Sequence, residues 1–151
     1  MPKMDWIALS RESTQKLGAY GEYFAKMELA SYGLDVYTSE VDDKGIDFVC
    51  LKGKRVLKIQ VKSNMKKKGN PYAYKKHFDI QDEDLYMFVL LFEQGRLPEP
   101  YLIPATAWQT ETALLKYHAP SGKKDYYIVN ASTQNMPLLT PYRLEEMLNR
   151  L

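Results

Sequence analysis

The sequence predicts an α/β or α+β domain built on a central mixed β-sheet flanked by helices. Three patterns predict it: a near-N-terminal stretch with apolar residues at helical spacing, a hairpin with period-two alternation, and a near-continuous apolar run in mid-chain. The order helix, strands, helix, strand, helix fits this class. A chain of 151 residues is of common size for one domain with a real core, so we expect a single domain over residues 1–151.

The first helix is predicted from Ser13 to Tyr32, with Gly33 just past its end. Gly18 and Gly21 each cost about 1 kcal/mol of helix stability relative to alanine. That cost suggests close approach of the helix to the sheet or to a ligand. Glu22 lies at the border of the apolar stripe. It is either an ordinary boundary residue or a carboxylate that points over the sheet into a site.

A short strand is predicted next over residues 34–40, with Val36 inward. A hairpin with its turn at residues 52–54 follows, and alternation places its apolar residues on one face: Ile46, Phe48 and Cys50 in the first strand, and Leu57, Ile59 and Val61 in the second. Asp47 then shares the opposite face with Gln60 and Lys62. A carboxylate, an amide and an ammonium together can hold a hard divalent cation and place a positive charge beside it. The alternative is a hairpin whose polar face is simply solvated.

The rest of the chain alternates between strands and helices. Residues 63–77 contain Gly-Asn-Pro and have no period, so they predict a loop. The apolar run 84–93 predicts a central strand buried on both faces. The remaining expectations are a short strand at 77–80, a turn at 95–100, a strand at 101–104, a helix opened by Pro104 and reaching 117, a strand at 125–130, and a C-terminal helix capped by Thr140-Pro141 that carries Leu144, Leu148 and Leu151.

Charge is unevenly distributed, although the net charge is only +2. A basic zone surrounds and follows the hairpin: Lys52, Lys54, Arg55, Lys58, Lys62, Lys66, Lys67, Lys68, Lys75 and Lys76. Such a zone beside a metal site suggests a polyanionic substrate, and its alternative is a solvated surface loop. Tyr72 and Tyr74 flank these lysines, where they could stack on bases or sugars. The acids Glu40, Asp42 and Asp43 form either a solvated turn or a further source of carboxylate.

Composition narrows the class of protein. Hydrophobic residues at 45% and charged residues at 26% are typical of a soluble globular chain. No apolar run approaches the length of a membrane span, and the N-terminus lacks the apolar core of a signal peptide. The single Cys50 falls in a strand core and cannot form an internal disulfide. We therefore expect a cytoplasmic protein with no membrane partner and a structural cysteine.

Three short motifs occur in order along the chain. They are GxxGE as Gly18–Glu22, GxD as Gly45-Ile46-Asp47, and IQVKS as Ile59–Ser63. Together they resemble the PD-(D/E)xK nuclease superfamily, above all its Holliday-junction-resolvase-like and intron-associated endonuclease-like small domains. The likeness covers roughly residues 13–110 and implies a restriction-endonuclease-like fold. Gln60 departs from the pattern, because an acid is usual there, so the chain carries a QxK variant.

The resemblance implies a metal-dependent DNA endonuclease that uses Mg²⁺ or Mn²⁺. Asp47, Gln60 and the carbonyl of Val61 would hold the metal. Lys62 would orient or activate the attacking water or stabilise developing negative charge, and Glu22 would complete the site directly or through water. DNA would be the partner, and cutting both strands would require at least two chains. The residues expected to bind DNA are Lys66, Lys67, Lys68, Tyr72, Lys75 and Lys76.

Two other functions remain open. Gln60 removes one negative charge from the site, which favours a nucleic-acid-binding module on the same fold that no longer cuts. The third possibility is a protein-interaction domain that uses the fold as a scaffold within a defence or mobile-element system. Salt-dependent DNA binding separates the third from the other two.

Overall fold

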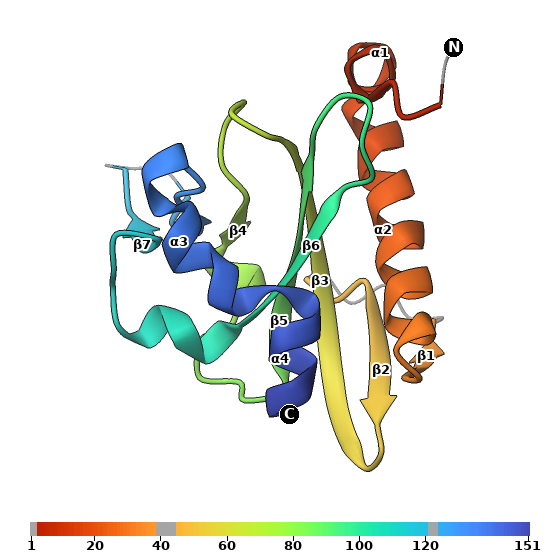
Figure 1. The fold of residues 1–151 in the computed structure, drawn as a ribbon. Helices are drawn as coiled ribbons and strands as arrows, with labels where there is room; N and C mark the ends of the chain where they lie inside the picture. The colour runs from red at the N-terminus through yellow and green to blue at the C-terminus, as the bar shows by residue number, and fades with distance from the viewer. Residues whose placement is uncertain (1–2, 39–44, 121–123) are drawn as a thin grey trace.

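The computed structural model describes residues 3–38, 45–120 and 124–151 (Figure 1). Two β-sheets form its centre. The larger sheet has the strand order β1-β2-β3-β5-β6. Its strands are β1 (Asp35–Tyr37), β2 (Phe48–Lys52), β3 (Arg55–Met65), β5 (Leu85–Phe92) and β6 (Glu99–Pro104). The smaller sheet has the order β4-β8-β7, with β4 (Tyr72–Tyr74), β7 (Leu115–His118) and β8 (Tyr126–Val129).

The larger sheet is mixed, as the sequence predicts. Its β1, β2 and β3 pair antiparallel, β3 and β5 pair parallel, and β5 and β6 pair antiparallel. Every residue of β5 is buried, so the apolar run is confirmed as a central strand. Strand β3 pairs with β5 as far as Met65, but its last partner on β2 is at Ile59. Beyond Ile59, β3 therefore has no paired strand on its β2 side among the described residues.

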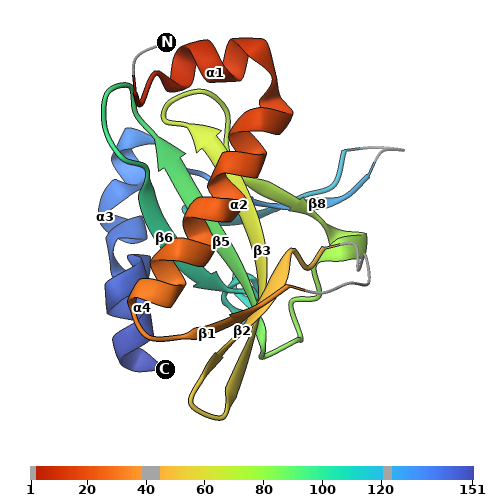
Figure 2. The ribbon, with the colours of Figure 1, turned by 90° about the vertical axis from the view of Figure 1, so that its right-hand side faces the viewer.

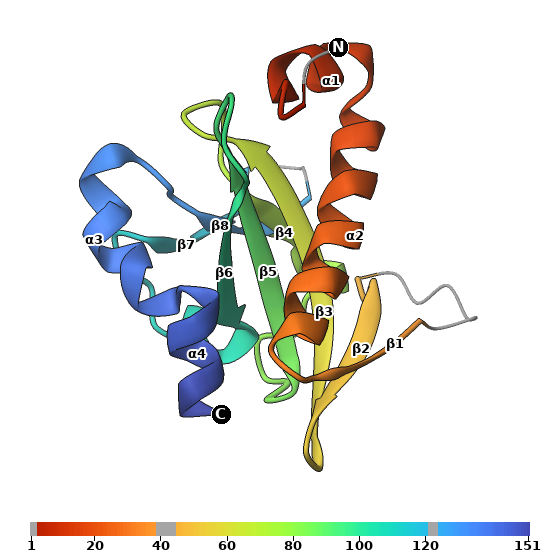
Figure 3. The same ribbon diagram turned by 45° about the vertical axis from the view of Figure 1, so that its right-hand side comes forward.

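Helices cover one face of this sheet (Figures 2 and 3). The helix α2 (Thr14–Ser31) confirms the predicted first helix, and the Ser13 side chain caps its N-terminus. Its buried residues Phe24, Ala25 and Leu29 join a core cluster with Phe48, Cys50, Leu57, Ile59 and Phe88 from the sheet and with Leu144, Met147 and Leu148 from α4 (Leu144–Arg150). The preceding α1 (Trp6–Glu12) packs through Trp6 against Tyr20 and Phe92.

The smaller sheet lies on the other face of the large one (Figure 3). A second core cluster fills the space between them, with Met87, Val89 and Leu91 of β5 facing Ala73, Leu115, Tyr127 and Val129 of the smaller sheet. Trp108 of the 3₁₀ turn η2 (Ala105–Gln109) and Leu139 of α3 (Met136–Leu139) complete this cluster. The molecule is therefore layered as helices, mixed sheet and small sheet.

The structure corrects the predicted elements between residues 63 and 118. Strand β3 runs on to Met65, and the segment expected to be a loop also contains β4 and the 3₁₀ turn η1 (Lys75–His77). Residues 77–80 form no strand. The helix expected after Pro104 is only the short η2, followed by β7. Three-residue strands and 3₁₀ turns are too short to show a period in the sequence, so tertiary packing decides them.

Three further expectations need correction. Ile46 does not share the face of Phe48 and Cys50: it packs against the second core cluster, because regular β2 geometry begins only at Phe48. Thr140-Pro141 does not cap the last helix but opens the 3₁₀ turn η4 (Thr140–Tyr142), and Arg143 is the N-cap of α4. The β1 strand ends at Tyr37, while Glu40, Asp42 and Asp43 lie outside the described residues.

Close packing against the sheet explains why α2 has a glycine at Gly21, but it does not explain the glycine at Gly18. A Cβ built on Gly21 would lie 1.9 Å from the Ser63 Oγ atom and 3.3 Å from Leu90 Cδ1. The helix therefore approaches β3 and β5 too closely for any side chain at this position. A Cβ on Gly18 would meet nothing within 4 Å, so the predicted close approach is confirmed at Gly21 only. None of the described helices is both long enough and apolar enough to span a bilayer.

Candidate metal and nucleic-acid site

Asp47 lies where β2 begins, and it reaches across the backbone of Gln60. Its backbone N–H donates a hydrogen bond of 2.8 Å to the carbonyl of Ile59. Its Oδ2 atom accepts a hydrogen bond of 2.7 Å from the N–H of Val61. The carboxylate thus occupies the edge of β3 at the point where β2 stops pairing with it. The close association of Asp47 with the Gln60–Lys62 segment, expected from the sequence, is confirmed.

The backbone of Val61 adds an oxygen to this edge. Within a β-strand, the N–H and C=O of one residue point toward the same neighbouring strand. Since the Val61 N–H points at Asp47, the Val61 carbonyl also faces the β2 side of β3. The expectation that this carbonyl lies beside Asp47 therefore agrees with the strand geometry.

Gln60 is a buried polar residue whose side-chain amide is incompletely hydrogen-bonded. Its side chain is 5% exposed, and its Oε1 atom has no hydrogen-bond partner among the described residues. An unpaired buried amide oxygen costs about 1–3 kcal/mol. Such a cost is normally offset by a bound ion, a water molecule or a donor from a ligand. Gln60, the residue before Val61, therefore offers a buried lone-pair oxygen to an electropositive partner.

Gln60 and Lys62 face the smaller sheet rather than α2. They pair with Met87 and Val89 of β5, which belong to the second core cluster. Lys62 is thus partly enclosed between the sheets, and burial lowers the pKa of its ammonium, against the opposing effect of Asp47. Burial raises the pKa of Asp47, against the Val61 N–H and the charges of Lys62 and Lys26. In both groups burial disfavours the charged form, and pKa values perturbed by burial are common in catalytic sites.

Lys26 is a site residue that sequence reasoning missed. Its Nζ atom lies 5.6 Å from the ring centroid of Phe48, the residue after Asp47, and its charge lowers the pKa of Asp47. It also lies 3.6 Å from Glu22 Oε1, one helical turn earlier. The structure therefore connects Glu22 to the Asp47 site through Lys26. The i,i+4 spacing of Glu22 and Lys26 was the available signal.

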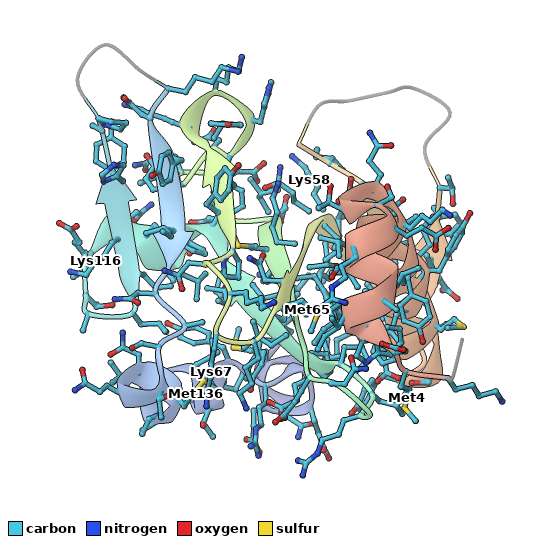
Figure 4. The ribbon with its side chains drawn as sticks, turned by 90° about the horizontal axis from the view of Figure 1, so that it is seen from above. Met4, Lys58, Met65, Lys67, Lys116 and Met136 are labelled. Atoms are coloured by element: carbon cyan, nitrogen blue, oxygen red, sulfur yellow. The ribbon has the colours of Figure 1, made fainter. Side chains whose placement is uncertain are left out.

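The predicted basic zone is split into two parts. Lys66, Lys67 and Lys68 follow β3, with Lys66 ion-paired to Glu93 at 3.9 Å. At about 3.3 Å per residue, this loop begins some 13 Å beyond Lys62 along the strand. Figure 4 shows Lys58 and Lys67 at separate places on the molecule. Lys58, in turn, pairs with Asp82 at 2.8 Å.

The second part of the basic zone lies beside the site. Lys75 and Lys76 are in η1, which ends at His77. A Cβ on Gly45, two residues before Asp47, would lie 2.2 Å from the His77 carbonyl oxygen, and Gly45 has a φ of +97°. Only glycine fits there, so η1 packs directly against the segment that leads into Asp47. Tyr74, just before η1, also tends to raise the pKa of Lys62.

The candidate metal ligands at this site are few, and all of them are oxygen atoms. No group of three or more histidine, cysteine or acidic residues gathers to bind a metal in the part of the chain that the structure describes. The candidate oxygen ligands are the Asp47 carboxylate, the Gln60 amide and the Val61 backbone carbonyl. Magnesium keeps several of its waters and often takes only one or two protein carboxylates. The residues present therefore fit a hydrated hard cation and do not fit a closed zinc site.

Comparisons with known proteins reveal the fold. No protein-family model matches the chain, and no curated protein matches it. Among solved structures, it is similar to Hjc, a Holliday junction resolvase from Archaeoglobus fulgidus, with a TM-score of 0.56, 18% identity, and coverage of 87% of this chain and 95% of that one. It is also similar to the bacterial homing endonuclease I-Ssp6803I, with a TM-score of 0.53, 21% identity, and coverage of 91% and 90%. The chain therefore has the restriction-endonuclease-like fold.

Proposed function

We propose that this protein is a metal-dependent DNA endonuclease that hydrolyses phosphodiester bonds. The observation that carries the proposal is the position of the Asp47 carboxylate at the open edge of β3, hydrogen-bonded to the N–H of Val61. The preceding residue, Gln60, has a buried Oε1 atom without a hydrogen-bond partner among the described residues. The similarity in fold to a junction resolvase and a homing endonuclease supports DNA as the substrate. Mg²⁺ or Mn²⁺ is the cofactor that fits these oxygens.

The chain's own residues have distinct roles in this proposal. Asp47, Gln60 and the carbonyl of Val61 hold the cation, which activates water and neutralises charge that develops on the phosphate. Lys62 lies within the electrostatic reach of Asp47 and contacts the reacting phosphate or the water that attacks it. Lys26 and Glu22 position Asp47 from the other side of the strand.

Basic residues on both sides of the site bind the DNA backbone in this account. Lys75 and Lys76 lie beside Gly45, while Lys66, Lys67 and Lys68 extend the positive surface beyond β3. Cleavage of both strands would use two copies of the chain, since each chain has one Asp47 site.

A second function is favoured by one specific feature. Gln60 is neutral, and no group of three or more histidine, cysteine or acidic residues gathers among the described residues. A module that binds nucleic acid without cutting is therefore the alternative. A nicking assay on supercoiled and on branched DNA with Mn²⁺ separates the two functions. Metal-dependent nicking that is lost in Asp47→Ala supports the endonuclease, and salt-dependent binding without nicking supports the alternative.

A further inference from the structure

The outer face of the smaller sheet is aromatic. Register places Tyr74, Tyr126 and His118 opposite one another across its three strands, and places Tyr72 beside Ile128 in the next row. Ring centroids are 5.2 Å apart for Tyr72 and Tyr126, and 4.9 Å for Tyr126 and His118. We call Tyr72, Tyr74, Tyr126 and His118 the aromatic platform. The alternate residues Ala73 and Tyr127 point inward and are buried in the core.

The platform is not part of that core. Tyr72 is 42% exposed, and His118 is also exposed. Cross-strand aromatic pairs stabilise a sheet by only about 0.2–1 kcal/mol each, and the opposite face of this sheet already supplies the core. Exposed apolar groups of this kind usually mark a binding surface.

Lysines border the platform. Lys124 Nζ lies 4.9 Å from the ring centroid of Tyr74. A hollow of about 490 Å³ is lined by Tyr74, Lys75, Lys76, Lys124 and Asp125. Lys116 adds a positive charge on β7, on the side of the molecule away from α2 (Figure 4). The platform is therefore suited to an anionic ligand that has flat rings.

A second hollow extends from the platform to Asn64 of β3, two residues beyond Lys62. It has a volume of about 430 Å³, and Asn64 lines it together with Tyr72, Tyr74 and Tyr126. Asn64 follows Lys62 by two residues in β3, so the two share a face of the strand. Tyr74 is also close enough to Lys62 to influence its pKa. A strand that leaves Lys62 along this face would pass directly over the tyrosine rings.

We propose that the aromatic platform binds the unpaired bases of a single-stranded DNA segment next to the bond that is cut. Alternating aromatic rings and lysines are the usual means of holding single strands, because every base has a face that can stack. The bases of an intact duplex are already stacked and expose only their edges. This inference rests on the proposed function for its location, and it defines the substrate as DNA with an unpaired strand beside the site.

Binding without metal tests this inference independently of cleavage. Fluorescence anisotropy in EDTA would compare a dT15 oligonucleotide with the same backbone made abasic, with U15 and with a duplex of equal length. We expect dT15 to bind roughly tenfold more tightly than the abasic strand. Tyr72→Ala with Tyr126→Ala should remove that preference, while Tyr72→Phe with Tyr126→Phe should retain it. Tyr37→Ala, which removes an exposed tyrosine from β1, is the matched control and should change nothing.

Each outcome bears on a different claim. Equal affinity for dT15 and the abasic strand would overturn the platform and leave the endonuclease proposal intact. U15 binding tenfold more tightly than dT15 would overturn the assignment to DNA. A confirmed base preference without metal-dependent nicking would support the platform and reject cleavage. Failure to bind any of the oligonucleotides would overturn the platform, and the nicking assay with Mn²⁺ would still decide the endonuclease proposal.

Discussion

The N–H of Val61 donates a hydrogen bond of 2.7 Å to the carboxylate of Asp47, and this contact fixes the candidate site to the edge of β3. It places a negative charge where β2 stops pairing, against the residue that follows Gln60 in β3. The buried amide oxygen of Gln60 has no hydrogen-bond partner among the described residues. Burial of the Asp47 charge costs folding free energy that a bound cation would recover. The predictions below test that relationship and the surfaces around it.

The first prediction concerns stability in the absence of metal. Asp47→Asn should raise the free energy of unfolding at pH 7 by about 1 kcal/mol in EDTA, since asparagine keeps the acceptor for Val61 but loses the buried charge. The raised pKa of Asp47 means that the folded state holds its proton more tightly than the unfolded state. Stability from this group is therefore present at low pH and lost as pH rises through its folded pKa.

Urea denaturation from pH 4 to pH 8 measures this effect. The difference between Asp47→Asn and the wild type should grow with pH over the lower part of that range. Glu22→Gln is the matched control, since its half-buried carboxylate forms an ion pair with Lys26 within α2. A wild-type protein that is more stable than Asp47→Asn at every pH would show that Asp47 has a structural role instead.

The second prediction concerns metal affinity. Gln60→Glu should tighten Mn²⁺ binding, because it adds a charge at an oxygen that already lacks a partner among the described residues. Asp47→Asn should weaken binding by at least tenfold, and more than Glu22→Gln does. Calorimetric titration measures all three. Identical titrations for all variants would refute the assignment of Asp47 and Gln60 as ligands.

The third prediction separates binding from chemistry. Alanine at Lys66, Lys67 and Lys68 should weaken DNA affinity and flatten its salt dependence. The slope of log affinity against log salt should change by about 0.9 for each phosphate that the variant no longer neutralises. Lys62→Ala should abolish cleavage and leave most of the DNA affinity intact, because Lys62 is partly enclosed between the sheets. Unchanged affinity of the triple variant at every salt concentration would mean that its lysines are only a solvated surface.

The fourth prediction tests the contact of α2 with the sheet. Gly21→Ala should destabilise the fold by about 1–3 kcal/mol, since its Cβ would clash with the Ser63 Oγ atom, and Ser63→Ala should partly restore stability. Gly18→Ala is the control. It meets nothing within 4 Å and should stabilise the helix by up to about 1 kcal/mol. Thermal unfolding of Gly21→Ala, of Gly21→Ala combined with Ser63→Ala, and of Gly18→Ala measures these changes in stability. Equal effects at the two glycines would contradict the structure.

Local sequence patterns predicted the parts of this fold that repeat with a clear period. The α2 helix has helical spacing, and the apolar run of β5 is long enough to identify a buried strand. The short β4 and β7 strands were missed because three or four residues show no period. Their positions are decided by burial of Ala73 and Leu115 against the distant β5.

The sequence predicted which residues would form the centre of the candidate site, but not the side chains from other elements that contact it. Order along the chain brought Asp47 together with the Gln60–Lys62 segment, and the structure agrees. Alternation did not extend back to Ile46, because the strand begins later than the pattern implied. Lys26 and the aromatic platform depend on side chains from separate elements meeting in space, which no local pattern records.

The nicking of supercoiled DNA by wild type and by Asp47→Ala in the presence of Mn²⁺ tests the central claim most directly. We predict that the wild type converts supercoiled to nicked circles only when metal is present, and that Asp47→Ala does so at least about a hundredfold more slowly. Equal rates for the two proteins, or no nicking of either supercoiled or branched DNA by the wild type with any divalent metal, would contradict an endonuclease centred on Asp47.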